Sequence, residues 1–201
     1  MRERGCKLEI FKQIAYGFDV GPMVAALYEN HEVWDHIKAR QETPGSAHSE
    51  TKTIFLRWAK SQTVDAAFNE VEAVDYPALK VFPEAGDLIR LFSDMVKPTE
   101  LGRVIITSLK PFGMIEPHID EGEYPDHFQR FHIPISCGPG SIFCGRGEDG
   151  KTETAKMRPG DLWWFDNKKT HWVENMCDTP RVHMIFDAVV PGYERPYDIS
   201  K

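Results

Sequence analysis

Residues 181–189 read RVHMIFDAV and carry a clear strand pattern. Side chains alternate between the two faces of a strand, so this run has one polar and one apolar face. The polar face carries Arg181, His183, Ile185 and Asp187, and the apolar face carries Val182, Met184, Phe186 and Ala188. The apolar face needs a cover. Charged groups that face the interior of a sandwich are costly unless they are paired.

Similar short runs rich in Val, Ile, Phe and Trp precede this one from residue 103 onward. Turn sequences such as Gly138-Pro139-Gly140 and Pro159-Gly160-Asp161 separate them. Many short strands with frequent turns are typical of a sandwich or barrel. The expected strands are Arg103–Leu109, Gln129–Ser136, Ser141–Gly145, Leu162–Phe165, His171–Glu174 and Arg181–Val189.

The first half of the chain has a helical period instead. One helix is expected to begin at Gly21-Pro22 and to run toward Ile37, and the strand-like run Thr51–Trp58 follows it. A second helix is expected to bury Val64, Ala67, Phe68, Val71 and Val74, and a third, between Pro83 and Pro98, to bury Leu88, Leu91, Phe92 and Met95. The chain is therefore predicted to be α+β, with helices first and a β-sandwich after them.

Composition limits the classes of function. The 201 residues suit one compact unit, and a net charge of −7 argues against a nucleic-acid backbone as partner. There is no apolar run of about 18 residues that would suggest a membrane span, and the start, MRERGCKLEIFK, lacks the apolar segment of a signal peptide. The four cysteines form no CxxC pair and are predicted to be free thiols, so we expect a cytoplasmic protein.

The sequence Glu116-Pro117-His118-Ile119-Asp120 is the first candidate site. On an extended strand His118 and Asp120 point the same way and can hold one ion. His171, which begins a later expected strand, supplies a third ligand. Two imidazoles and one carboxylate with open positions form the ligand set of non-haem Fe(II) oxygenases. The alternative is a chance His-x-Asp with a hydrogen-bonded core histidine.

Two Arg-x-His patterns form the second candidate site. Arg130 and His132 lie on one expected strand, and Arg181 and His183 lie on another. If both pairs face the interior they form an anion pocket, because arginine binds carboxylates in a bidentate manner. The alternative is that these are edge strands whose polar pairs face water.

These residues together resemble the aspartyl/asparaginyl β-hydroxylase family of Fe(II)/2-oxoglutarate-dependent dioxygenases, over Ile106 to Val190. His171 and Arg181 keep the family's ten-residue spacing, and the Phe165-Asp166 pair and Asp187 match further family positions. The resemblance implies a double-stranded β-helix (jelly-roll, cupin-like) core over residues 101–192. Residues 1–100 would form a mainly helical region with one or two strands, packed on that core in the same compact unit, and 193–201 would be a tail.

The resemblance also implies roles for single residues. His118, Asp120 and His171 would bind Fe(II), and Arg181 would bind the distal carboxylate of 2-oxoglutarate. The remaining expected co-substrate contacts are Arg130, His132, Thr107, Leu109 and His183. Several family members have glycine where this chain has Asp120, so the complete triad here strengthens the iron assignment and weakens any transfer of their substrates.

The implied reaction is hydroxylation of an unactivated C–H bond in an amino acid or peptidyl side chain. It consumes O₂ and converts 2-oxoglutarate to succinate and CO₂, with ascorbate as reductant in vitro. Two other functions remain open: a non-catalytic cupin-like protein that binds a metal or a small acid, and an interaction module that has lost catalysis. The oligomeric state has no signal in the sequence.

A polar loop and strand at residues 39–58 lie before the expected core. We hypothesise that Arg40, His48 and Arg57 bind a polar substrate at the mouth of the sandwich; an ordinary surface loop is the alternative. His127 is expected to be an exposed loop residue. Cys137 and Cys144 flank a turn, but their spacing is a weak zinc signal.

Overall fold

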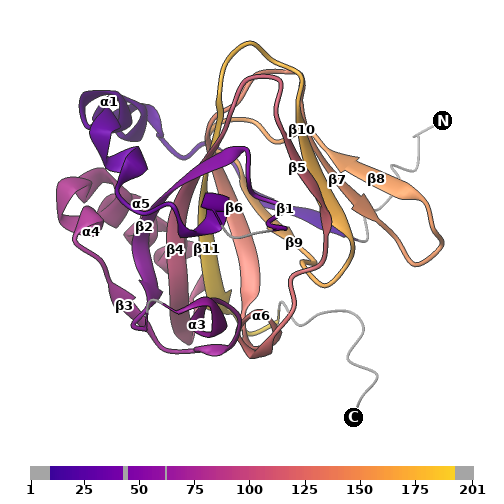
Figure 1. The fold of residues 1–201 in the computed structure, drawn as a ribbon, viewed down its shortest axis with the longest axis horizontal. Coiled ribbons are helices and arrows are strands. Elements are labelled where there is room, and N and C mark those ends of the chain that lie inside the picture. Colours follow the sequence, from indigo (N-terminus) through magenta and orange to yellow (C-terminus); the bar gives the residue numbers. More distant parts are fainter. Residues whose placement is uncertain (1–9, 43–44, 62, 193–201) are drawn as a thin grey trace.

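The computed structural model describes residues 10–42, 45–61 and 63–192. Two antiparallel sheets face each other, as Figure 1 shows. The larger has seven strands in the order β1-β9-β6-β11-β4-β2-β3, and the smaller has four in the order β5-β10-β7-β8. The predicted double-stranded β-helix fold with additional helices is confirmed.

The strands are β1 (Phe11–Ala15), β2 (Thr51–Ala59), β3 (Ala73–Asp75), β4 (Glu100–Leu109), β5 (Met114–His118), β6 (Gln129–Ser136), β7 (Ser141–Arg146), β8 (Thr152–Ala155), β9 (Leu162–Phe165), β10 (His171–Asn175) and β11 (Arg181–Val189). The helices are α1 (Gly21–Glu29), a 3-10 turn η1 (His31–Asp35), α2 (Ala39–Glu42), α3 (Val64–Asn69), α4 (Ala78–Val81), α5 (Pro83–Val96) and α6 (Glu123–His127).

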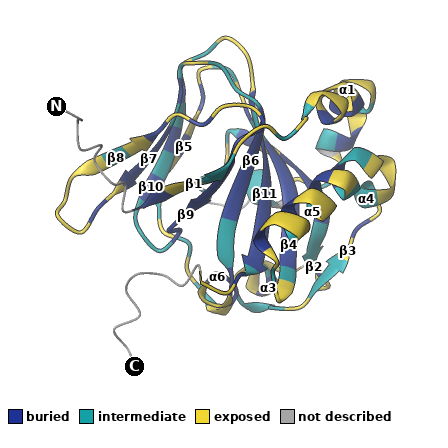
Figure 2. Ribbon diagram, turned by 180° about the vertical axis from the view of Figure 1, so that it is seen from behind, coloured by how far each residue is buried: buried dark blue, intermediate teal, exposed yellow. Residues whose placement is uncertain are grey.

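The apolar face of β11 is covered by the helices of the first half of the chain. Met184 and Phe186 are fully buried in a cluster with Phe92 of α5 and Leu27 of α1. Figure 2 shows α5 across the outer face of the seven-stranded sheet. The polar face of β11 is therefore turned toward the smaller sheet, inside the sandwich.

The first hundred residues contribute more to the sheet than the sequence predicted. One or two strands were expected before residue 100, whereas β1, β2 and β3 all lie in the seven-stranded sheet. Strand β2 pairs with β4 so that Thr53 lies opposite Thr107. This pairing brings the segment before β2 close to the interior of the sandwich.

The predicted helix Val64–Val74 is wrong in its second half. Helix α3 ends at Asn69, and Ala73–Asp75 pairs with β2 instead. The buried guanidinium of Arg103 donates hydrogen bonds to the carbonyls of Ala66, Ala67 and Glu70 and thus binds the end of the helix. The expected apolar face is also wrong, since Val64 and Phe68 are exposed.

Helix α5 forms where the sequence predicted it, but with a different buried face. Leu88 and Phe92 are buried as expected, whereas Leu91 and Met95 are exposed. The first predicted helix ends at Glu29 and continues only as the 3-10 turn η1. Within the described ranges, no helix combines the length and the apolar character that a bilayer span requires.

The cysteines that the structure describes are free thiols, as predicted: Cys137, Cys144 and Cys177. The Cys137 thiol donates to the carbonyl of Met157. Cys6 lies outside the described residues.

Candidate active site

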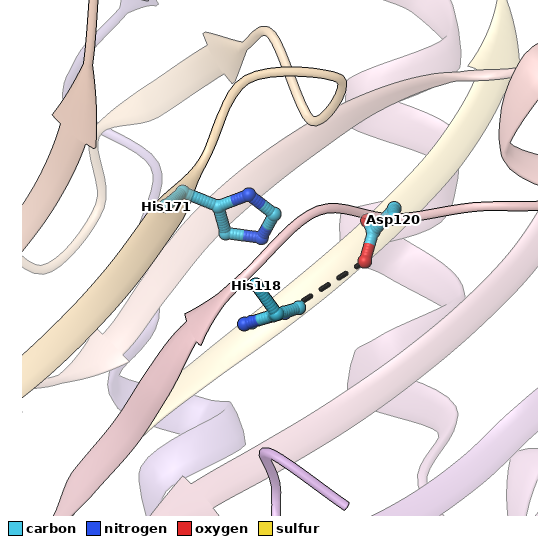
Figure 3. A group of neighbouring side chains, drawn as sticks. All are labelled: His118, Asp120 and His171. Carbon is cyan, nitrogen blue, oxygen red and sulfur yellow. Dashed lines mark ion pairs between the residues drawn. The ribbon is translucent and has the colours of Figure 1, made fainter. Parts of the chain in front are cut away.

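Three candidate metal ligands meet at the edge of the smaller sheet. His118 ends β5, and His171 begins β10 directly opposite it. Asp120 follows β5 by two residues. One ligand atom from each of the three lies within 4.8 Å of the others, and Figure 3 shows the side chains converging. The sequence motif therefore becomes a three-sided ligand set.

Both imidazoles are held in the tautomer that a metal requires. The Nδ1 atom of His118 lies 2.7 Å from the carbonyl oxygen of Glu116, and that of His171 lies 2.9 Å from the carbonyl of Lys169. A carbonyl only accepts, so each Nδ1 carries the proton and each Nε2 keeps its lone pair. Burial, with His118 adding to it, lowers the pKa of His171 to about 4, so this ring is neutral near pH 7.

The carboxylate of Asp120 is oriented by two side chains. Its Oδ2 accepts hydrogen bonds from Arg130 Nη1 at 2.5 Å and Asn167 Nδ2 at 3.0 Å, while Oδ1 lies 3.8 Å from His118 Nε2. Burial alone would raise the pKa of Asp120, but Arg130 and the two imidazoles outweigh it and lower that pKa strongly. Asp120 is therefore ionised, with Oδ1 turned toward His118.

Strand alternation is not what places Asp120. Strand β5 ends at His118, and the backbone N–H of Asp120 donates to the carbonyl of Asn167 at 3.1 Å. Lys168 also donates to the carbonyl of Asp120 at 2.9 Å. Sequence reasoning missed Asn167 and Lys168, although both directly follow the Phe165-Asp166 pair.

Arg130 faces inward as predicted, but two carboxylates neutralise it. Besides Asp120, it binds both oxygens of Asp187, at 2.7 Å and 3.0 Å. These carboxylates outweigh burial and raise the pKa of Arg130. Arg130 therefore holds Asp120 in place. The expected contact of Arg130 with a co-substrate remains a prediction.

Arg181 is a buried cation that has no acidic partner in the described part of the chain. It is 3% exposed, and among residues 10–42, 45–61 and 63–192 no carboxylate lies within ion-pair distance of it. Burial lowers its pKa to about 10, so it is still charged near pH 7. Its Nη2 donates to His183 Nδ1 at 3.0 Å, and its guanidinium lies 5.6 Å from the ring of Phe143. Such a group is stabilised by a bound anion.

A cavity that is open to solvent lies among these groups, with about 400 Å³ of empty space that includes part of the solvent at its mouth. Its described lining includes four of the predicted co-substrate residues: Thr107, Arg130, His132 and Arg181. His132 Nε2 is buried without a hydrogen-bond partner in the described structure. The remaining lining is Arg40, His48, Ile115, His118, Phe143, Phe165, His171, Val173 and Ile185.

Two predicted co-substrate residues are not part of this lining. Leu109 pairs with Arg181 across the strands but packs into an apolar cluster with Phe11 and Phe143. His183 lies behind Arg181 and 3.3 Å from His132, measured between Nδ1 atoms. A direct role for Leu109 or His183 remains a prediction.

The three residues that were expected to bind substrate from the 39–58 segment do not lie together in the structure. Arg40 and His48 line the cavity, so for them the alternative of an ordinary surface loop does not hold. Arg57 lies elsewhere: it pairs with Asp75 and donates to the carbonyls of Gly102 and Ala73, which fastens β3. The hypothesis that Arg57 binds substrate is therefore wrong. His127 ends α6, half exposed, and pairs with Glu100.

The residues present fit Fe(II) and 2-oxoglutarate. The ligand set of two imidazoles and a carboxylate suits Fe(II) and leaves coordination positions open. In the same cavity the unpaired Arg181 suits a carboxylate of a dicarboxylic acid. A double-stranded β-helix with this site defines the class of Fe(II)/2-oxoglutarate-dependent oxygenases.

Comparisons with solved structures agree with this fold. A 2OG-Fe(II) oxygenase family oxidoreductase from Burkholderia pseudomallei matches 88% of this chain and 94% of its own, at 14% identity and a TM-score of 0.52. A Pseudomonas putida prolyl-4-hydroxylase matches 92% and 94%, at 13% identity and a TM-score of 0.50. At these identities the likeness shows the fold. A search of curated proteins found no match.

The family model for aspartyl/asparaginyl β-hydroxylase matches residues 25–191. The chain belongs to this family, and it is a hydroxylase of the 2OG-Fe(II) oxygenase class. The family implies Fe(II) and 2-oxoglutarate as cofactors. The resemblance that the sequence motifs indicated is thus confirmed.

Proposed function

We propose that this protein hydroxylates an unactivated C–H bond in an amino acid or peptidyl side chain. The observation that carries the proposal is one cavity lined by His118, by His171 and by Arg181, which has no acidic partner in the described residues. Asp120 completes the ligand set with the two histidines.

Each residue then has a defined task. His118, Asp120 and His171 hold Fe(II), and Arg181 binds the distal carboxylate of 2-oxoglutarate with Thr107 and His132 beside it. When bound, the iron and 2-oxoglutarate supply the oxidising power: O₂ is consumed, 2-oxoglutarate becomes succinate and CO₂, and a C–H bond becomes C–OH.

The chain itself orients these groups and limits access of water. Arg130 and Asn167 keep Oδ2 of Asp120 occupied, so that Oδ1 is the oxygen free to bind metal. The carbonyls of Glu116 and Lys169 hold the imidazole protons of His118 and His171 on Nδ1, so that each Nε2 is free to bind metal. Apolar side chains complete the walls: Ile115, Phe143, Phe165, Val173 and Ile185.

The proposal is tested by succinate formation from 2-oxoglutarate with Fe(II), ascorbate and O₂. The native protein should form succinate, with or without a pool of amino acids and peptides, and His171→Ala should not. His127→Ala is the matched control, because it removes a half-exposed histidine that pairs with Glu100 away from the cavity, and it should behave as native.

A second variant separates anion binding from metal binding. Arg181→Met should raise the KM for 2-oxoglutarate at least about tenfold, because a charge-assisted contact is lost. It should leave binding of Mn(II), used in place of iron, unchanged. If the native protein binds Mn(II) but forms no succinate with any substrate pool, the proposal fails and a cupin-like binding protein becomes the better reading.

A further inference from the structure

The cavity is lined by another arginine, Arg40, which is half-buried as a residue and which neither proposed cofactor is expected to contact. Arg40 lies in α2, and its side chain lines the cavity beside His48 and His118. Its Nη1 atom is buried and has no hydrogen-bond partner in the described structure. In the same ranges no carboxylate lies within ion-pair distance of it. A buried polar group of this kind normally has a partner.

The nearby carboxylates are already engaged. Asp120 and Asp187 act on Arg40 at longer range, but both hold Arg130 directly. Burial and the charge of Arg130 lower the pKa of Arg40 to about 10, so it is a cation near pH 7. A guanidinium can donate hydrogen bonds but cannot accept them. What satisfies Arg40 must therefore be an anion or another acceptor that enters the cavity.

His48 adds a second unsatisfied group at the same place. Its Nδ1 is buried without a partner in the described structure, and its ring lies edge-on to that of His118, with 5.0 Å between centroids. The loop that carries both residues is held together by Ser46. The Ser46 hydroxyl donates to the carbonyl of Arg40 at 2.6 Å and accepts from the N–H of His48 at 3.1 Å.

Arg40 and Arg181 have different neighbours in the cavity. The charges that act on Arg40 include Arg130, Asp120 and Arg103, whereas the charge of Arg181 acts on His132 and His183. Arg181 also contacts His183 and Phe143, and Arg40 lies with His48 and His118. The two guanidinium groups therefore lie in different surroundings within one cavity.

We infer that Arg40, with His48 beside it, binds a free carboxylate of the primary substrate and holds that substrate next to the candidate metal centre. The inference rests on the proposed function and narrows it. It makes the substrate a compact carboxylic acid, such as a free amino acid, rather than an internal peptide residue without a free acid. The other source of a carboxylate at Arg40 is the co-substrate, and the experiment separates the two.

The experiment uses the full-length protein loaded with Mn(II) and 2-oxoglutarate in the absence of O₂. Binding of each of the standard L-amino acids, and of its α-carboxamide, is measured by calorimetry. At least one acid should bind, and its carboxamide should bind about 10- to 100-fold more weakly, because a charge-assisted hydrogen bond is lost. Arg40→Met should weaken binding of the amino acid by a similar factor and should abolish the preference for the acid over its carboxamide.

Two further variants serve as controls. Arg40→Lys keeps the charge without the planar fork and should recover part of the affinity. Arg57→Met removes an arginine of the same segment that binds Asp75 outside the cavity, and it should leave acid binding unchanged. In all variants the affinity for 2-oxoglutarate, measured before the acid is added, should stay within about twofold of native.

Three results would overturn the inference. The first is that no amino acid binds the native complex, and the second is that amino acids and their carboxamides bind with equal affinity. The third is that Arg40→Met weakens the binding of 2-oxoglutarate as much as the binding of the amino acid. The last result would assign Arg40 to the co-substrate. Because this assay needs no turnover, its failure is distinct from an absence of succinate formation, which would refute the proposed function itself.

Discussion

Asn167→Ala is the sharpest test of how this chain orients its metal-binding carboxylate. Asn167 is 2% exposed, and its Nδ2 donates to Oδ2 of Asp120 at 3.0 Å. Its backbone carbonyl separately accepts from the N–H of Asp120. Truncation to alanine therefore removes the side-chain contact and keeps the backbone contact that places Asp120.

The magnitude follows from these contacts. A hydrogen bond to a charged acceptor contributes about 1.5–3 kcal/mol, so the free energy of unfolding should fall by about that amount. Arg130 still holds Oδ2 at 2.5 Å, so Asp120 stays ionised. The carboxylate is nevertheless freer to turn. Loss of such an outer contact typically weakens metal binding about 10- to 100-fold.

The assay measures Mn(II) binding to the metal-free protein by calorimetry, with the free energy of unfolding from urea denaturation alongside. Asn175→Ala is the matched control: Asn175 is equally buried, and its Nδ2 donates to the carbonyls of Lys110 and Thr179 away from the metal ligands. It also loses a long contact from the Cys177 N–H to its Oδ1 at 3.4 Å. The variant should lose about 1–3 kcal/mol of stability, mainly from the two neutral hydrogen bonds of Nδ2, but keep native Mn(II) affinity.

The reasoning is refuted by either of two outcomes. If Asn167→Ala binds Mn(II) as tightly as the native protein, the contact to Oδ2 does not orient the ligand. If both asparagine variants weaken Mn(II) binding equally, the effect reflects general loss of stability and not the geometry around Asp120.

Two further predictions concern buried charge. Asp187→Asn leaves Arg130 with one carboxylate, so the free energy of unfolding, measured by urea denaturation, should fall by about 3–5 kcal/mol because a buried ion pair is broken. Asp75→Asn breaks a more exposed pair with Arg57 and should lower the free energy of unfolding by about 1 kcal/mol or less. Equal losses in the two variants would contradict this ranking. Burial and the charge of Arg181 hold the pKa values of His132 and His183 well below their ordinary value. The unfolded chain therefore binds more protons than the folded one below about pH 6.5, so the free energy of unfolding of the metal-free protein should fall as the pH drops from about 7 to 5, by up to about 1.4 kcal/mol per pH unit for each imidazole. Urea denaturation across this range should show a shallower slope for His132→Phe, and a flat profile for the native protein would disprove the argument.

The strands that the sequence predicted and those that it missed differ in their place in the sheets. The predicted strands β4, β6, β9 and β11 are internal to the large sheet, and each carries apolar residues that are buried in the core. The strands without a prediction, β1, β3 and β8, are all at sheet edges. Edge strands such as Thr152–Ala155, which reads TETA, pair on one side only and leave little apolar signal.

The candidate site divides in a similar way. His118 and Asp120 are two residues apart, and His171 keeps a recognisable spacing to Arg181, so local sequence was sufficient to propose them. The contacts of Asn167, and the arrival of Arg40 and His48 at the same cavity, depend on how distant segments pack. Residue spacing contains no information on such contacts. The hypothesis for the 39–58 loop did place Arg40 and His48 at the site, but it wrongly included Arg57.

The three arginines of the cavity show why the fold was needed to assign their roles. From the sequence, Arg130 and Arg181 are equivalent inward-facing cations, but Arg130 holds two carboxylates, whereas Arg181 and Arg40 have none within ion-pair distance in the described structure. Counting Asp120 and Asp187, the cavity therefore carries one net positive charge. A divalent iron would raise this charge to three, and dianionic 2-oxoglutarate would lower it to one. A substrate with one net negative charge and a carboxylate at Arg40 would bring the filled site to neutrality, which a buried site favours because unpaired charge is costly there.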